Sequence, residues 1–206
     1  RVSRLGFAPL RQVEPRMTTL PQSLAEALAE VSTEIDAQFD VLLAIPEDPR
    51  ADLYRAMRHA AIGGGKRLRP LLVFATASLF GVDRACASRV ATAIEAIHVY
   101  SLIHDDLPAM DDDDMRRGKP TVHKMFSEAC AILAGDCLHA LAFEILANPD
   151  RLSDPFVRIE LVRALAVASG PDGMAGGQMM DLAAESESFD LPTITRLQQL
   201  KTGALI

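Results

Sequence analysis

The chain has 206 residues, of which 49% are hydrophobic and 5% are aromatic, and it has no tryptophan. This length and apolar fraction suffice for one domain with a substantial core, and the dominance of Ala and Leu favours packed helices over sheets. The formal net charge of −7 argues against a nucleic-acid-binding surface, because no basic stripe is left to neutralise a phosphate backbone.

Residues 1–16 precede the first regular pattern. They carry four arginines and two prolines and lack the apolar core of a secretory signal. We interpret them as a disordered leader or a remnant of expression, with the natural start near Met17. An arginine-rich transit peptide is the alternative, although the segment has little serine.

A period of 3.6 residues runs through most of the remaining chain. Apolar residues three or four apart predict an amphipathic helix over Leu24–Leu42, which stops before Pro46. A short helix is expected over Asp52–Ile62 and ends at three glycines. From Pro70, an almost uniformly apolar run reaches a stop at Gly81 and predicts a buried helix.

Asp83 is suited to cap the next helix, which is expected to continue to the aspartates that begin at Asp105. Further helices are predicted over residues 122–133, 136–146, 155–169, 173–184 and from Pro192 to the end. No window alternates between apolar and polar residues beside hairpin turns, so no strands are expected. The last segment has neither cap nor stop signal, which predicts that its helix is cut in mid-turn and that the chain is a fragment.

Six aspartates fall within ten residues of the sequence HDDLPAMDDDDMRRGKPT, which spans His104–Thr121. Carboxylates this close raise one another's pKa values unless cations neutralise them, so the segment predicts a divalent-metal site. The arginine pair that follows places guanidinium groups beside the metal, and this combination indicates phosphate. An acidic solvated loop or an adventitious calcium site is the alternative.

The early and late aspartates can share an ion only if the helix is interrupted between them. On a continuous helix, the nearest same-face carboxylate to Asp105 is Asp112, about 10 Å away along the axis. Pro108 cannot donate the helical hydrogen bond and disfavours helix for the residue before it. If two residues bulge out there, Asp111 returns to an i+4-like position over Asp105 and the two can clamp magnesium ions that also bind phosphate.

A second cluster of charge follows the three glycines in the sequence GGGKRLRP. This turn delivers Lys66, Arg67 and Arg69 at a helix start, where the helix dipole and free amides also favour an anion. It is not a P-loop, because GxxxxGK[ST] and a preceding strand are missing. Together with Arg116 and Arg117 it indicates a second diphosphate pocket; a turn with solvated bases is the alternative.

Three more polar residues have informative positions. His98 lies seven residues before Asp105, two turns away on the same helix face, so it is expected to point along the same cleft unless it is a satisfied core histidine. Gln178 and Asp181 follow a glycine pair and lie i, i+3 on one helix face, unless they are simply exposed in a first turn. The remaining histidines are assigned no role: His59, His104, His123 and His139.

Five motifs in this order make the chain specifically similar to a known family. They are GGGKRLRP, EAIHVYSLIHDDLPAMDDDDMRRGKPT, ILAGDCLHALAFEIL, GMAGGQMMDL and KTGALI. Residues 17–206 resemble the trans-isoprenyl diphosphate synthase family, and within it the bacterial farnesyl diphosphate synthases most closely. The resemblance implies an all-α isoprenoid synthase bundle of roughly ten antiparallel helices around a central cavity, of which residues 17–206 would form the N-terminal two-thirds.

The same resemblance implies head-to-tail transfer of a prenyl group from an allylic diphosphate to isopentenyl diphosphate. Three aspartates would hold magnesium ions (Mg2+, with Mn2+ as a substitute) on the allylic diphosphate: Asp105, Asp106 and Asp111. Four residues would hold isopentenyl diphosphate: Lys66, Arg69, His98 and Arg117. Arg116 and Lys201 would bind the allylic diphosphate. Lys201 and Thr202 match the family's Lys-Thr pair beside the leaving group, and Gln178 and Asp181 match its catalytic GGQ-x-x-D segment.

Product length is inferred from two residues before the aspartates. Tyr100 lies five residues before Asp105, about 7.5 Å along a helix axis, a depth that a growing prenyl tail reaches within one or two isoprene units. The family's farnesyl synthases have an aromatic residue at the matching position, and Ser101 leaves space beside it. We therefore expect a fifteen-carbon product; Tyr100 as an ordinary core residue is the alternative.

Family members carry a second aspartate-rich motif beyond the Lys-Thr pair, and the chain stops before it. If Ile206 is the true terminus, a third metal position lacks its ligands and we expect turnover to be severely impaired. The alternatives are a geranylgeranyl or geranyl diphosphate synthase and a truncated, non-catalytic synthase-like subunit. A class I terpene cyclase would leave the isopentenyl pocket without a purpose, and a calcium-binding protein lacks support because EF-hand spacing is absent.

The expected partners are small-molecule isoprenyl diphosphates and, as in the family, a second copy in a homodimer. Nucleic acid is not expected as a partner, because of the negative net charge. A membrane span is not expected either, because no apolar run approaches about 20 residues. Three cysteines without CxxC spacing predict buried free thiols in a reducing cytoplasm: Cys86, Cys130 and Cys137.

Overall fold

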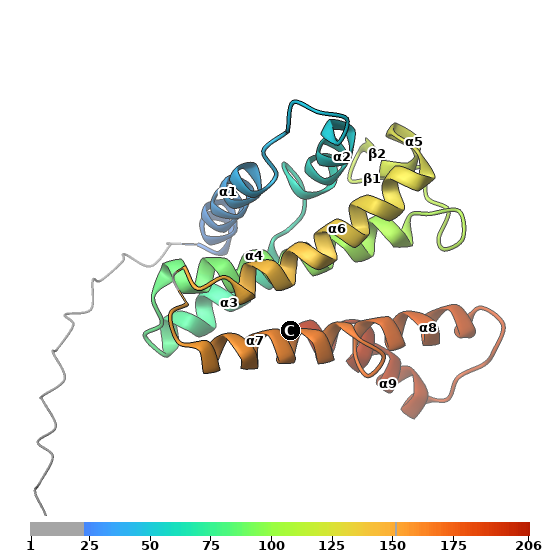
Figure 1. The fold of residues 1–206 in the computed structure, drawn as a ribbon. Helices are drawn as coiled ribbons and strands as arrows, with labels where there is room; N and C mark the ends of the chain where they lie inside the picture. Colours follow the sequence, from blue (N-terminus) through green and yellow to red (C-terminus); the bar gives the residue numbers. More distant parts are fainter. Residues whose placement is uncertain (1–22, 151) are drawn as a thin grey trace, which may run out of the picture.

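The computed structural model describes residues 23–150 and 152–206, so the predictions for the leader at 1–16 and the start near Met17 lie outside the described residues. The described chain is helical apart from one short hairpin, which confirms the predicted all-α fold (Figure 1). The helices are α1 (Leu24–Leu42), α2 (Ala51–Ala61), α3 (Leu68–Leu79), α4 (Arg84–Asp105), α5 (Val122–Met125), α6 (Glu128–Ala147), α7 (Pro155–Ser169), α8 (Met174–Ala184) and α9 (Leu191–Lys201). Strands β1 (Met115–Arg116) and β2 (Lys119–Pro120) form the hairpin, and a 3-10 turn covers Gly203–Leu205.

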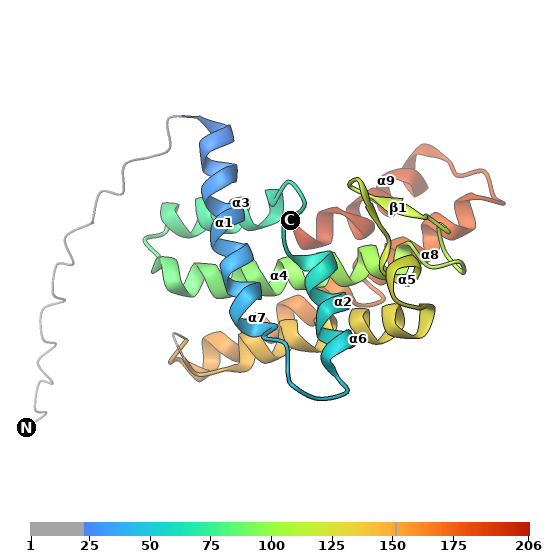
Figure 2. The same cartoon turned by 90° about the horizontal axis from the view of Figure 1, so that it is seen from above.

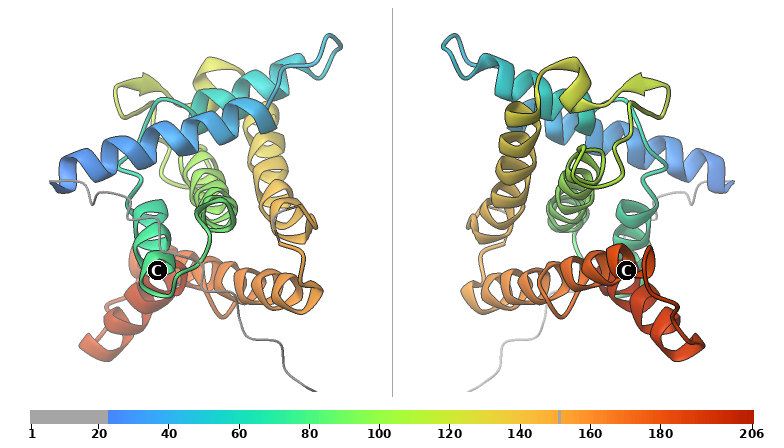
Figure 3. Two further views of the ribbon diagram at one scale, coloured as in Figure 1. Left: turned by 90° about the vertical axis from the view of Figure 1, so that its left-hand side faces the viewer. Right: turned by 90° about the vertical axis from the view of Figure 1, so that its right-hand side faces the viewer.

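Helix α4 lies at the centre of the fold, antiparallel to α6 (Figure 1). Both helices bury small residues, such as Ala91 and Ala96 on α4 and Ala134 on α6, so their backbones can approach closely. Helices α1 and α2 cross over one side of this pair rather than run along it (Figure 2). Helices α7, α8 and α9 form a layer on the opposite side (Figure 3). The C-terminal end of α4 therefore points toward the hairpin and α8.

Polar caps account for many of the helix starts. Five side chains accept hydrogen bonds from first-turn amides, at the starts of α1, α4, α6, α7 and α9: Ser23, Asp83, Ser127, Asp154 and Asp190. The predicted cap at Asp83 and the predicted bounds of α1 and α7 are thereby confirmed.

The predicted break between helices at residues 133–136 is wrong. Helix α5 ends at Met125, Ser127 caps α6, and α6 then continues through Gly135 to Ala147. The ring of His104 fills the space that a side chain at position 135 would occupy. Gly135 is therefore a packing residue in this helix and not a stop signal.

The prediction that the chain has no strands is also wrong. Strands β1 and β2 pair antiparallel, with Met115 opposite Pro120. Arg117 and Gly118 at the tip have φ values of 53° and 77°, and positive values at both positions are what a type I′ hairpin turn requires. Strands of two residues are too short to show the alternation that was searched for.

Helix α3 is less buried than predicted. Pro70 and Phe74 are buried, whereas the Leu79 and Phe80 side chains at its end are 84% and 79% exposed. The outer face of α3 instead lines an apolar groove with Val157 of α7 and other residues. A uniformly apolar run does not distinguish a helix covered on all sides from one that borders an open groove.

The last helix is shorter than predicted. Helix α9 ends at Lys201, Thr202 is its C-cap, and the 3-10 turn follows.

None of the three cysteines forms a disulfide within the described residues, and all three are half-buried rather than buried.

Helix α6 corrects the prediction that no apolar run has membrane-spanning length. It has 20 residues with a mean hydropathy of 1.7, enough by length and composition to cross a membrane. Its inner face is nevertheless buried in the core beside α4, through residues such as Leu138, Ile145 and Leu146.

Candidate active site

The aspartate-rich segment begins where α4 ends. The amide of Asp111 donates to the carbonyl of Asp105 at 2.8 Å, which replaces the i to i+4 helical bond by a bond across six residues. Two residues therefore bulge out beside Pro108, as the sequence predicted. Burial raises the pKa of Asp105 to about 6, the cation Lys201 opposes this rise, and the carboxylates of Asp111 and Asp106 add to it. Asp105 and Asp111 thus share one electrostatic environment.

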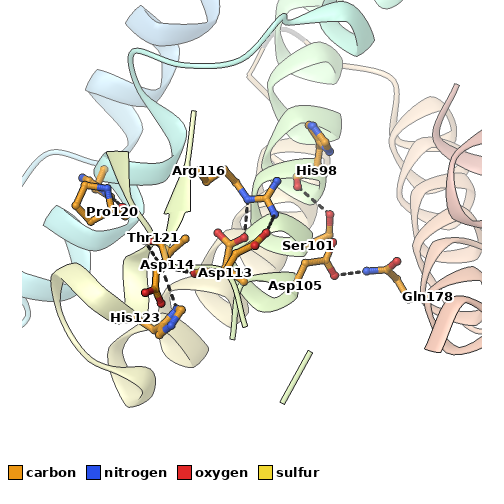
Figure 4. Close-up of polar contacts among 12 residues, drawn as sticks. His98, Ser101, Asp105, Asp113, Asp114, Arg116, Pro120, Thr121, His123 and Gln178 are labelled. Carbon is orange, nitrogen blue, oxygen red and sulfur yellow. Dashed lines mark hydrogen bonds and ion pairs between the residues drawn. The ribbon is translucent and has the colours of Figure 1, made fainter. Parts of the chain in front are cut away.

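Asp106 faces a different partner. Asp106 is 3% exposed, and its carboxylate accepts from Nε of Arg116 at 2.5 Å. Arg116 also reaches Asp113 at 3.4 Å (Figure 4). Burial raises the pKa of Asp106, and the hydrogen bond from Arg116 opposes that rise. Asp106 thus forms an ion pair with Arg116, while its charge also acts on Asp105.

The carboxylates at the end of α4 are candidate ligands for a divalent cation. Across residues 23–150 and 152–206, no group of three or more His, Cys, Asp or Glu is arranged to hold a metal ion. The pair Asp105 and Asp111 fits a more open site, because Mg2+ is commonly bound through one or two carboxylates with water and phosphate oxygens as the other ligands. Burial is the main cause of the raised pKa of Asp105, and a cation bound beside the carboxylate would lower it.

Four predicted residues line one pocket on the other side of α4. Lys66, Arg69, His98 and Arg117 surround it, together with the glycine turn. In the described part of the chain, none of Lys66, Arg69 and Arg117 makes an ion pair, although burial lowers the pKa values of both arginines. Burial, then the charges of Arg69 and Arg117, lower the pKa of His98 to about 3. The positive charge of its lining makes this pocket suited to bind an anion.

The hairpin supplies the two neighbouring guanidinium groups in different directions. Arg116 turns to Asp106. Arg117, at the tip, turns into the pocket that it lines with Lys66, Arg69 and His98, which we call the cation pocket because its lining is positively charged. The hairpin is tied to α2, because His59 Nε2 lies 2.8 Å from the carbonyl of Pro120 and Lys119 donates to the carbonyl of Ile62 at 3.5 Å. His59, to which the sequence assigned no role, is therefore part of the support for the arginines.

Helices α8 and α9 bring the downstream motifs to Asp105. Gln178 of α8 donates from Nε2 to Oδ1 of Asp105, and Lys201 of α9 pairs with Asp181 (Figure 4 for Gln178). A side chain on Gly177 would collide with the backbone of Lys201, so the glycine allows the two helices to meet. Thr202 is exposed at the end of α9, and no described contact joins it to the aspartates.

A largely apolar cavity lies between α4 and α8, and Asp105 is among its lining residues. Tyr100, Ser101, Met174 and Met179 are among its lining residues. The ring of Tyr100 packs edge-on against His139, with centroids 4.9 Å apart, and against His104 at 5.7 Å. The aromatic residue that was expected to limit a hydrocarbon tail is therefore at this cavity wall and is held by neighbouring rings.

One functional feature has no clear signal in the sequence. Arg67 looks like another base of the glycine turn, but its side chain is fully buried and paired with Glu95 and Asp36. These partners lie 28 and 31 residues away in the chain, so local spacing gives no hint of them.

Comparisons with known proteins agree with this geometry. The polyprenyl synthetase family model matches residues 50–206. A farnesyl diphosphate synthase of Escherichia coli (strain K12) is 55% identical over 152 residues, 73% of this chain and 50% of that protein. A geranylgeranyl pyrophosphate synthase 4 of Arabidopsis thaliana is 45% identical over 166 residues, 79% of this chain and 44% of that protein.

Solved structures are similar as well. A crystal structure of a FPP/GFPP synthase from Zymomonas mobilis has 66% sequence identity and a TM-score of 0.85, and the match covers 86% of this chain and 65% of that chain. The chain spans about half the length of the curated relatives that it matches.

Proposed function

Because the chain belongs to the polyprenyl synthetase family, we propose that the protein condenses isopentenyl diphosphate with dimethylallyl or geranyl diphosphate and yields farnesyl diphosphate. The observation that carries the proposal is a pocket of three cations without ion-pair partners next to a carboxylate pair, on either side of one helix end. A condensation of two diphosphates needs two such anion sites, one of which can ionise its substrate.

Each site has a distinct task in this reaction. Lys66, Arg69, His98 and Arg117 bind the diphosphate of isopentenyl diphosphate and keep its double bond near the allylic carbon. When bound by Asp105 and Asp111, Mg2+, or Mn2+ in its place, supplies positive charge that stabilises the leaving diphosphate. Asp106, the third proposed metal ligand, also orients Arg116 through their ion pair.

The downstream residues complete the allylic site in the proposal. Arg116 and Lys201 add positive charge to the allylic diphosphate, with Lys201 oriented by Asp181. Gln178 holds Asp105, and Thr202 offers a hydroxyl dipole toward the developing cation. The allylic C–O bond breaks, the isopentenyl double bond forms the new C–C bond, and a proton then passes to the released diphosphate.

The apolar cavity beside Asp105 suits the hydrocarbon part of the substrate. Its lining is largely apolar, as a carbocation that water would otherwise capture requires. Tyr100, with Ser101 beside it, lies where the tail of a fifteen-carbon product would end. The relative named FPP/GFPP synthase and the relative named geranylgeranyl pyrophosphate synthase favour a second candidate, a longer product.

The partners and location follow the family in this proposal. We infer a homodimer in the cytoplasm that uses small isoprenyl diphosphates as its substrates. The alternative of a non-catalytic subunit has less support, because both anion sites are intact in the described residues.

Product analysis tests the proposed function. The full-length protein is incubated with isopentenyl and geranyl diphosphates, with and without Mg2+, and the products are sized. A fifteen-carbon product that requires Mg2+ is expected, and Tyr100→Ala should shift it to twenty carbons or more. A twenty-carbon product from the unsubstituted protein would refute the assigned chain length, and no condensation would refute the enzyme.

A further inference from the structure

A buried ion-pair network lies outside the residues that the proposed reaction uses. The Arg67 side chain is 0% exposed, and that of Glu95 is 2% exposed. Arg67 Nη1 donates to Glu95 at 2.7 Å, and Nη2 donates to Asp36 at 2.5 Å and to the carbonyl of Ala61. One guanidinium therefore joins α1, the end of α2 and the middle of α4.

This network forms the back of the cation pocket. Arg67 and Glu95 line the same pocket as the four residues proposed to bind isopentenyl diphosphate. Burial lowers the pKa values of Arg69 and Arg117, and the charge of Glu95 acts in the opposite direction on both. An unpaired Glu95 would thus attract the two guanidinium groups that an anion in the pocket needs.

The network also fixes the glycine turn. The second oxygen of Asp36 accepts from the amide of Gly63 at 3.1 Å, and Arg67 itself has a positive φ of 49°. The turn that carries Lys66 is therefore attached to α1 at its first glycine and at Arg67.

We propose that Arg67 is a positioning residue that neutralises Glu95, so that Lys66, Arg69 and Arg117 remain available to a diphosphate. This inference rests on the proposed function and assigns no substrate contact to Arg67. Without the arginine, the buried carboxylate of Glu95 lacks its ion-pair partner, and Arg69 and Arg117, on which its charge acts, line the same pocket. The substrate anion then competes with Glu95.

A double-mutant cycle tests this competition in the full-length protein. Arg67→Met, Glu95→Gln and the double variant are compared for the KM values of isopentenyl and geranyl diphosphates and for isopentenyl diphosphate binding by calorimetry. Arg67→Met should raise the KM of isopentenyl diphosphate by at least about tenfold and leave that of geranyl diphosphate nearly unchanged. The double variant should return to within about threefold of the original value, because the competing carboxylate is gone.

A matched control comes from α1, the helix that carries Asp36. Asp40 of α1 pairs with Arg58 one turn beyond Asp36 and does not line the pocket, so Asp40→Asn should leave both KM values unchanged. If Arg67→Met fails to fold, Arg67→Lys replaces it, because one ammonium group cannot reach both carboxylates in the same way.

The outcomes separate the two proposals. Equal rises in both KM values, or a double variant as impaired as Arg67→Met, would overturn the inference alone. No binding of isopentenyl diphosphate by the unsubstituted protein would instead overturn the proposed function and, with it, this inference.

Discussion

At the scale of single residues, His98 shows how the cation pocket acts on its own side chains. Burial and the nearby arginines lower its pKa from 6.5 to about 3, so it is neutral in the folded protein at any pH near neutrality. A neutral imidazole can donate to a diphosphate without adding charge. The same displacement of the pKa has a measurable consequence for stability.

We expect His98 to make folding stability depend on pH. Below pH 6.5 the unfolded chain protonates His98 and the folded chain does not, so stability falls as the pH decreases toward 3. Relative to His98→Gln, the original protein should lose about 1.4 kcal/mol for each pH unit in this range. Urea unfolding of both proteins at pH 7.5 and 5.5 measures the difference. Parallel pH dependence of the two would show that His98 is protonated normally.

The glycine turn supports a second prediction at this scale. Gly65 has a φ of 91°, and a side chain there would collide with the guanidinium of Arg117. Gly65→Ala should therefore weaken isopentenyl diphosphate binding about tenfold and destabilise the fold by about 1 kcal/mol. Gly64→Ala is the control, because its φ is not positive and its nearest atoms lie at an ordinary 3.7 Å. Similar affinities for the two variants would contradict this placement of Arg117.

The sequence predicted much of the site, because its residues are local in the chain or tied to a helix period. The bulge at Pro108 could be predicted in this way, whereas the common pocket of Lys66, Arg69, His98 and Arg117 was implied by the family resemblance. The ion pair of Asp106 with Arg116 could not be predicted, since it depends on where the hairpin directs Arg116. The partners of Arg67 could not either, because they come from distant helices.

At the scale of elements, most helix boundaries were predicted closely, and the main errors lie between α5 and α6 and at the end of α9. Asp83 satisfies the first amides of α4 with a side chain two residues away, so its signal is local. The break predicted at residues 133–136 was wrong, because Gly135 makes room for the ring of His104 on α4, and no local pattern contains that contact.

Gly135 therefore offers a test of element packing. Alanine in a helix interior normally stabilises by about 1 kcal/mol relative to glycine. Here Gly135→Ala should destabilise instead, by roughly 1–3 kcal/mol, because the new methyl group overlaps the ring of His104. Since His104 precedes Asp105, activity should fall as well.

The double variant Gly135→Ala/His104→Ala identifies the cause. Removing the ring gives the methyl group space, so thermal unfolding should show the two substitutions to be less harmful together than their sum. Additive effects would mean that the ring and the glycine are not in contact in solution.

At the scale of the whole molecule, the described chain leaves one side of its helical layers uncovered. The groove between α3 and α7 is lined by apolar residues, and large side chains near it are exposed, including Phe80 and Phe156 at 79% and 77%. The pattern of α3 predicted a helix correctly but its burial wrongly, because what covers a helix face depends on elements elsewhere in the molecule.

This open face predicts the behaviour of the 206-residue chain when it is produced alone. Contiguous apolar surface of this kind drives association, so we expect the chain to self-associate in sedimentation experiments and to bind a hydrophobic dye. Phe80→Glu should reduce both, while the free energy of unfolding changes by no more than about 0.5 kcal/mol, because this side chain of the groove is already exposed. Leu24→Glu is the control, since Leu24 is 66% exposed on α1 and lines no part of the groove. An equal effect of both substitutions would attribute the association to net charge rather than to the groove.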